Sequence, residues 1–98
     1  MDTLTADALV RTDRPGRYAA QLAKHLGHRL QTEWNDTHGH IALPEGAGRC
    51  DMQTEPDGLR LHATAPDTAG LARLEDVVKR HLERWGEKDG IVVDFHRS

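Results

Sequence analysis

Three histidines near the ends of two predicted helices are the residues of this chain best suited to chemistry. His25 and His28 lie three positions apart at the end of one apolar repeat, and His81 lies near the end of a second one. A neutral imidazole can bind zinc, iron or copper, and it can act as a general acid or base near neutral pH. If the two helix ends meet, these rings could form a polar ligand site or a metal site. The structural alternative is packing, because a histidine in the last turn of a helix also gains from the helix dipole.

The neighbouring residues do not complete a metal motif. The chain has no Cys-x-x-Cys, no His-Glu-x-x-His and no histidine–carboxylate triplet around these positions. We therefore predict no metal site and no cofactor. Its one cysteine, Cys50, lies in a strand-like segment without a nearby base, so we expect it to be buried and unreactive.

Two arginines and a tyrosine form a second candidate group. Arg14 and Arg17 lie three positions apart at the start of the first predicted helix, and Tyr18 follows. A helix N-terminus presents free N–H groups and positive potential, so the arginines could hold a phosphate or a carboxylate there. The interpretation that we favour is that they pair with Asp13 and with acidic residues across the sheet. The ring of Tyr18 is expected in the core, with its hydroxyl at the rim of a pocket.

Length and charge restrict the class of protein. With 98 residues, the chain is expected to form a single domain, residues 1–98. Its 13 Lys and Arg against 16 Asp and Glu give a net charge of −3, which argues against a nucleic-acid partner. No segment is long and apolar enough for a membrane span, and the first residues do not resemble a secretory signal. We therefore expect a cytoplasmic protein without a membrane partner.

Periodicity predicts the elements that must position these side chains. Apolar residues at helical spacing indicate helices over about 14–26 and from Asp67 or Thr68 to Trp85, with Asp13 as the first cap. Alternation indicates the strands, which are 6–12, 30–34, 38–43, 49–54, 59–64 and 91–93. Two helices, short strands and tight turns predict an α+β fold, in which an antiparallel sheet of five to six strands carries both helices on one face. The terminal strands look unprotected, so a homodimer by edge pairing is a further expectation.

Two blocks of the sequence resemble a bacterial family known as domain of unknown function 2218. The first block is Thr12-Asp13-Arg14-Pro15-Gly16-Arg17-Tyr18-Ala19-Ala20-Gln21-Leu22 with His25-Leu26-Gly27-His28. The second is Leu74-Glu75-Asp76-Val77-Val78 with His81-Leu82-Glu83-Arg84-Trp85. Members of the family occur beside, or joined to, siderophore-interacting flavin reductases. The resemblance therefore implies a role around iron acquisition and such a reductase as the partner.

These observations lead to one main functional hypothesis and two alternatives. The main hypothesis is a small binding or accessory domain for an anionic or siderophore-related ligand. Its candidate ligand-binding residues are Arg14, Arg17, Tyr18, His25, His28 and His81. One alternative is a small enzyme that uses His25 or His81 as general acid or base beside an arginine clamp. The other is an interaction module without a pocket, which would dock through an exposed apolar patch.

Overall fold

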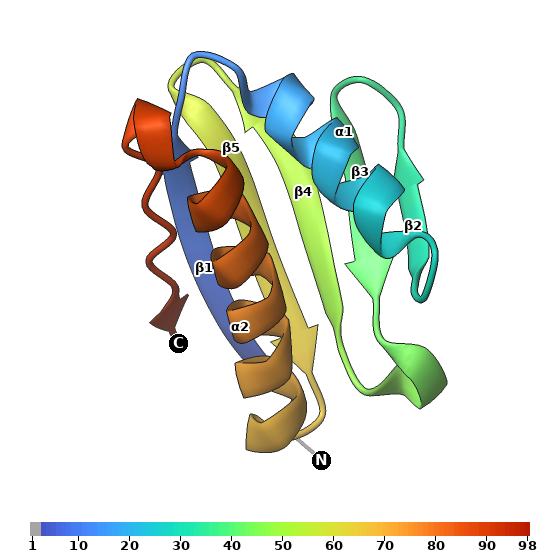
Figure 1. Cartoon of the computed structure of the whole chain (residues 1–98). Coiled ribbons are helices and arrows are strands. Elements are labelled where there is room, and N and C mark those ends of the chain that lie inside the picture. Colours follow the sequence, from blue (N-terminus) through green and yellow to red (C-terminus); the bar gives the residue numbers. More distant parts are fainter. Residues whose placement is uncertain (1–2) are drawn as a thin grey trace.

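The chain folds into one antiparallel sheet with two helices packed on it (Figure 1). The computed structural model describes residues 3–98. The strands are β1 (Leu4–Arg11), β2 (Gln31–Trp34), β3 (His38–Ala42), β4 (Arg49–Glu55), β5 (Gly58–Ala65) and β6 (His96–Arg97). The helices are α1 (Pro15–Leu26) and α2 (Thr68–Trp85), with short 3-10 turns η1 (Pro44–Gly46) and η2 (Glu87–Asp89). The predicted fold class, the element order and the placement of both helices on one face are confirmed.

The sheet order is β2-β3-β4-β5-β1-β6, and every neighbouring pair is antiparallel. The pairings from β2 to β5 join strands that follow one another in sequence, and the first strand lies inside the sheet between β5 and β6. The two edges are β2 and the two-residue β6. Such a short edge strand offers little backbone for edge-to-edge pairing with another chain.

Burial is restricted to the face of the sheet that carries the helices. In β1, Ala6, Ala8 and Val10 are buried, while the residues between them stay partly exposed. The helices bury matching stripes, and the largest fully buried side chains are Leu22, Ile41, Met52, Leu59, Leu61, Leu71, Leu74, Leu82, Val10, Val78 and Val93. Small alanines on the central strands let the helix stripes approach the sheet closely, which gives dense packing with few aromatic rings.

The aromatic residues contribute little to the core. Tyr18 is buried, but Trp34, Trp85 and Phe95 are only partly buried and pack at the margins. Leucine, valine and alanine side chains make up most of the core instead.

The start of α1 differs from the prediction. Its N-cap is Arg14, and no side chain caps the helix, so the expected cap by Asp13 is wrong. The hydroxyl of Thr12 instead accepts a hydrogen bond from the Arg14 N–H at 3.0 Å, before the first turn. Pro15 occupies the first helical position, where its missing N–H costs nothing. The helix ends at Leu26, as expected.

The start of α2 agrees with the prediction. The Asp67 carboxylate accepts the Gly70 N–H at 2.8 Å and caps the helix. Along the helix, Asp76 pairs with Arg80 at 3.4 Å and Lys79 with Glu83 at 2.8 Å. Glu75 instead pairs with Arg97 of β6 at 3.0 Å.

The last strand is also not where the sequence predicts it. Residues 91–93 are extended but make no ladder, and β6 covers only His96–Arg97. Two side chains of α2 form hydrogen bonds with the backbone of Val93. The Glu83 carboxylate accepts one from its N–H at 2.9 Å, and the Lys79 ammonium donates one to its carbonyl at 2.9 Å. Because these groups are already paired with α2, Val93 cannot join β1. Its side chain and that of Ile91 are buried under the helix.

We predict that Gly70→Ala destabilises the protein although alanine is the better helix former. Alanine gains about 1 kcal/mol in a helix interior. A Cβ atom at position 70 would, however, clash with the Ala47 carbonyl oxygen, which belongs to the loop after η1. Overpacking of this kind costs about 1–3 kcal/mol, so we expect a net loss. Urea unfolding measures it, with Ala69→Gly at the exposed neighbouring position as control. A more stable Gly70→Ala variant would contradict the close approach of this loop.

We also predict that Glu83→Gln weakens the attachment of the C-terminal segment in a pH-dependent way. The hydrogen bond from Lys79, and then that from the Val93 N–H, lower the pKa of Glu83 below its ordinary value of 4.5. The charged carboxylate therefore stabilises the fold above about pH 4.5, and this contribution is lost as the pH falls through the folded pKa. We expect a loss of about 1 kcal/mol at neutral pH, since the group is partly exposed, and a smaller loss near pH 3. Urea unfolding at both pH values, with Glu87→Gln as control, tests this; an equal loss at both would contradict it.

Candidate functional site

The crossing of the two helices brings together two of the predicted histidines. The ring centroids of His25 on α1 and His81 on α2 lie 5.0 Å apart, and the planes are tilted by 52°. Trp85 completes the group, with its ring 5.4 Å from His25 in an edge-to-face arrangement and 5.5 Å from His81. His25 is exposed, and the other two rings are half-buried. We call these three residues the helix-crossing cluster.

The orientation of the His81 ring is fixed by its own helix. Its Nδ1 lies 2.7 Å from the carbonyl oxygen of Val77, one turn earlier. Since a carbonyl can only accept, Nδ1 carries the proton and donates it. This leaves Nε2 available: it accepts a hydrogen bond when the ring is neutral and donates one when the ring is protonated. A ring held in this way can meet a ligand without first being ordered.

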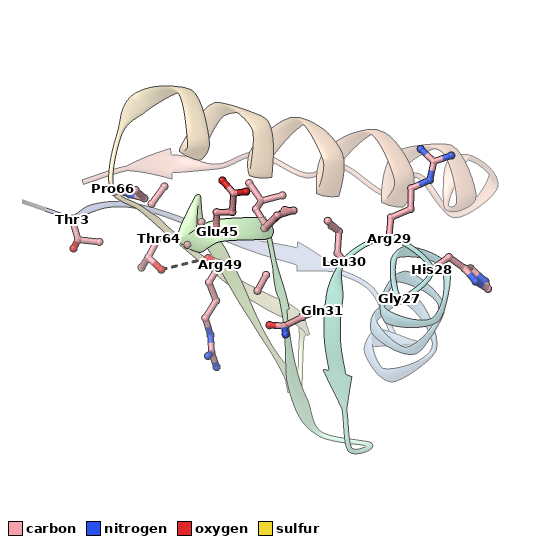
Figure 2. A pocket seen from close by; sticks show the side chains of 16 residues that line it. Thr3, Gly27, His28, Arg29, Leu30, Gln31, Glu45, Arg49, Thr64 and Pro66 are labelled. Atoms are coloured by element: carbon pink, nitrogen blue, oxygen red, sulfur yellow. Dashed lines mark hydrogen bonds between the residues drawn. The ribbon is translucent and has the colours of Figure 1, made fainter.

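His28 lies apart from this cluster, in the turn that follows α1. There it lines a cavity of about 940 Å³, which is open to solvent and is bounded by the turn, by β3, and by the loop around η1. Figure 2 shows that the charged side chains of this cavity diverge, with Arg29 directed toward α2, His28 outward and Arg49 away on the other side. Its walls are therefore mostly backbone and short side chains, and the basic groups do not converge on one point.

The two arginines lie at the opposite end of α1. Arg14 pairs loosely with Asp13 at 4.0 Å, as one of our two interpretations expected, while Arg17 has no ion-pair partner among residues 3–98. Arg17 and His25 are eight positions apart, which is about 12 Å along a helix. The six candidate residues therefore occupy three separate places: the start of α1, the contact between α1 and α2, and the turn after α1. The arginines do not form a clamp beside the histidines. None of the four best-defined cavities within residues 3–98 is lined by His25 or His81.

Tyr18 has a structural contact. Its ring is buried, and its hydroxyl donates a 2.6 Å hydrogen bond to the Asp89 carboxylate in η2. This bond, then burial, raise the pKa of Tyr18 above 10.0. The contact ties α1 to the segment after α2, and so helps to hold the two helices, with their histidines, together.

The helical layer carries an excess of positive charge. Residues 14–32 contain four cationic side chains and no carboxylate: Arg14, Arg17, Lys24 and Arg29. Nothing within residues 3–98 forms an ion pair with the last three, nor with Arg84, which lies three positions after His81. The acidic residues of α2, in contrast, are each paired with a base. Around the helix-crossing cluster, the protein therefore presents free cations although its net charge is −3.

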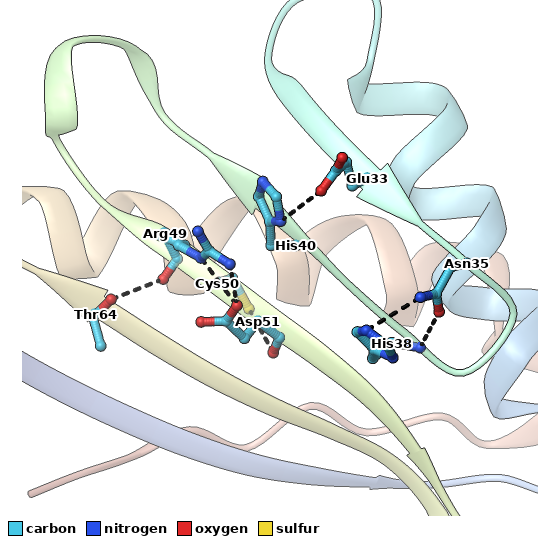
Figure 3. Close-up of polar contacts among 8 residues, drawn as sticks. All are labelled: Glu33, Asn35, His38, His40, Arg49, Cys50, Asp51 and Thr64. Atoms are coloured by element: carbon cyan, nitrogen blue, oxygen red, sulfur yellow. Dashed lines mark hydrogen bonds and ion pairs between the residues drawn. The ribbon is translucent and has the colours of Figure 1, made fainter.

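The remaining histidines and the cysteine lie on the sheet. His62 forms a 2.6 Å contact with Asp7 on the face that no helix covers. On the same face, His40 lies 3.8 Å from Glu33 (Figure 3). Sequence reasoning missed both contacts, because the partners come from different strands. The prediction for Cys50 is confirmed: it is fully buried, and burial raises its pKa to about 12.

Two further features bear on the alternatives. Within the described chain, no three His, Cys, Asp or Glu side chains gather closely enough to hold a metal ion. Val92 is the one large apolar side chain that is strongly exposed among residues 3–98, so the apolar docking patch expected of an interaction module is reduced to a single residue there. Neither α1 nor α2 has the length and hydropathy that crossing a bilayer would require.

Comparison with known proteins supports the resemblance seen in the sequence. A search of curated proteins gave no match. Among solved structures, the fold is similar to the NMR structure of PA4090 from Pseudomonas aeruginosa, with a TM-score of 0.73 and 29% sequence identity over 98% of this chain and 96% of that chain. A family described as "Uncharacterized protein conserved in bacteria (DUF2218)" matches residues 7–96. The two sequence blocks, the fold and this match together show that the chain belongs to the DUF2218 family.

Proposed function

We propose that this domain binds a small anionic ligand on its helical layer, at the crossing of α1 and α2. The observation that carries the proposal is the 5.0 Å approach of His25 and His81, whose rings come from helices far apart in the sequence and meet at the surface. Two imidazoles at such a distance can both reach one ligand group.

Charge defines the class of ligand. Lys24, Arg29 and Arg84 lie on the same two helix ends as the histidines, and none has an ion-pair partner within the described chain. Unpaired cations around a site raise the local concentration of anions and the rate at which they arrive. A carboxylate or phosphate group would also receive charge-assisted hydrogen bonds from a protonated His81, because Val77 already holds the other ring nitrogen.

Trp85 adds a flat, partly apolar surface to this site. Its ring meets His25 edge to face, so one part of the indole remains available beside the imidazoles. An aromatic face favours a ligand that has a planar or apolar part next to its anionic group. A siderophore is the first such ligand to test, because the family resemblance, rather than any side chain, suggests it. A siderophore-interacting reductase as partner is proposed on the same ground.

We predict that an anionic ligand perturbs His25 and His81 together, because their rings lie 5.0 Å apart. Histidine ring signals in NMR spectra would be followed while inorganic phosphate, an aromatic carboxylate and a ferric siderophore are added in turn. The signals of His25 and His81 should shift together with at least one of these ligands, and those of His38, which lies on the β2–β3 hairpin, should not.

Substitutions separate binding from packing at this site. His81→Phe keeps an aromatic ring but removes both nitrogens, so we expect the affinity to fall by about tenfold or more while the fold remains intact. His38→Phe is the matched control and should bind as the unsubstituted protein does. If His81→Phe binds every ligand normally, or if no ligand shifts His25 and His81, the pair is a packing contact and the proposal is wrong.

A further inference from the structure

The uncovered face of the sheet carries a pattern that only the strand register reveals. One cross-strand row runs through all six strands, and its members pair in order from one edge to the other. In this order, the row consists of Glu33, His40, Asp51, His62, Asp7 and His96. Carboxylate and imidazole thus alternate without a break across the whole sheet. We call this set the acid–imidazole row.

Contacts within the chain account for part of the row. His62 pairs with Asp7 at 2.6 Å, and His40 lies 3.8 Å from Glu33. Asp51 instead binds Arg49 at 2.8 Å, and it remains 45% exposed (Figure 3). His96, at the far edge, is 78% exposed and lies 3.6 Å from Asp94. Most members therefore keep a side that faces solvent, where another molecule could bind them.

The alternation makes the row complementary to itself. A row of six alternating members has opposite groups at its two ends, so reversing it places a carboxylate over every imidazole. A twofold axis that lies between two stacked sheets and runs along the strands, between β4 and β5, performs this reversal. Asp51 then faces the partner's His62, His40 faces the partner's Asp7, and Glu33 faces the partner's His96. An axis along the row would instead place each group over its own copy.

The rest of this face fits the same arrangement. The reversal places Arg49 over the partner's Thr64 and Arg60 over the partner's Gln53, so no two like charges meet. Six strands at about 4.8 Å spacing and five residues at about 3.3 Å give a face of roughly 500 Å² per copy. Two such faces bury about 1,000 Å², which is the lower end of specific interfaces and fits a weak dimer.

We propose that the uncovered sheet face binds a second copy of this chain, in a face-to-face dimer that forms when the histidines become protonated. While the imidazoles are uncharged, the three carboxylates give each row a negative charge, and two rows repel each other. Once the imidazoles take up protons, each carboxylate meets an imidazolium of the partner. Other charged groups on this face include Arg49, Arg60 and Asp94, the last beside His96. The dimer is therefore expected under mildly acidic conditions rather than at neutral or alkaline pH.

Sedimentation velocity at about pH 5.5 and about pH 7.5 tests this proposal directly. We expect a dimer at the lower pH, a monomer at the higher pH, and weaker association as salt is added. Asp51→His should weaken the dimer about tenfold or more, because it places two imidazoles opposite each other at the centre of the face. Adding His62→Asp to this variant exchanges the two groups and should restore the dimer, although it breaks the alternation within each chain.

Two controls make the result decisive. Glu87→His changes the charge equally but lies in η2, away from the sheet face, and it should dimerise normally. If Asp51→His fails to fold, Gln53→Lys places a cation opposite the partner's Arg60 at an exposed position, and it should weaken the dimer in the same way. A monomer at every pH overturns the proposal. So does equal weakening by Glu87→His, or a double variant that dimerises no better than Asp51→His.

Discussion

The structure depends on burial of the sheet on one face only. Both helices pack on the same side, and the buried residues of every central strand point toward them. Since side chains alternate along a strand, each buried alanine or leucine forces its neighbours onto the uncovered face. A shift of one residue in any pairing would expose the core, so the register is strongly fixed. This constraint, rather than any local contact, determines where the polar residues of the sheet can lie.

One-sided burial also separates the charges. The acidic residues of the strands have no place except the uncovered face, where Asp7 and Asp51 meet bases on the same face. The outward side of α1 is free of carboxylates, so its cations are balanced by nothing on the same helix. A protein with a net charge of −3 thus presents a basic surface around α1 and a sheet face rich in carboxylates. The two surfaces would attract different partners, and neither property is visible in the overall composition.

Much of this architecture could be predicted from the sequence, because its signals are local. The apolar stripes of both helices, the Asp67 cap and the turn at 56–58 each depend on residues a few positions apart. The last strand could not be predicted, because valine at position 93 is a residue type that strands favour. Its backbone N–H and carbonyl instead form hydrogen bonds with the side chains of Glu83 and Lys79 in α2. The cap of α1 was wrong for a different reason: the N-cap is Arg14, one residue after the expected Asp13, and no side chain caps the helix.

The two groups of histidines show where sequence reasoning reaches its limit. His25 and His81 could be paired from the residue pattern alone, because each ends a helix of the same kind and two helices on one sheet face lie side by side. His62 and Asp7 are 55 positions apart, and their contact depends on the register of two strands separated by most of the chain. The candidate ligand site lies at two helix ends, which can be predicted from residues close together in the sequence. The acid–imidazole row depends instead on how distant strands pair. The buried core lies between them, and within residues 3–98 no hydrogen bond or ion pair joins the two groups. We therefore expect a ligand at the helices and a second copy on the sheet to bind independently unless the core itself repacks.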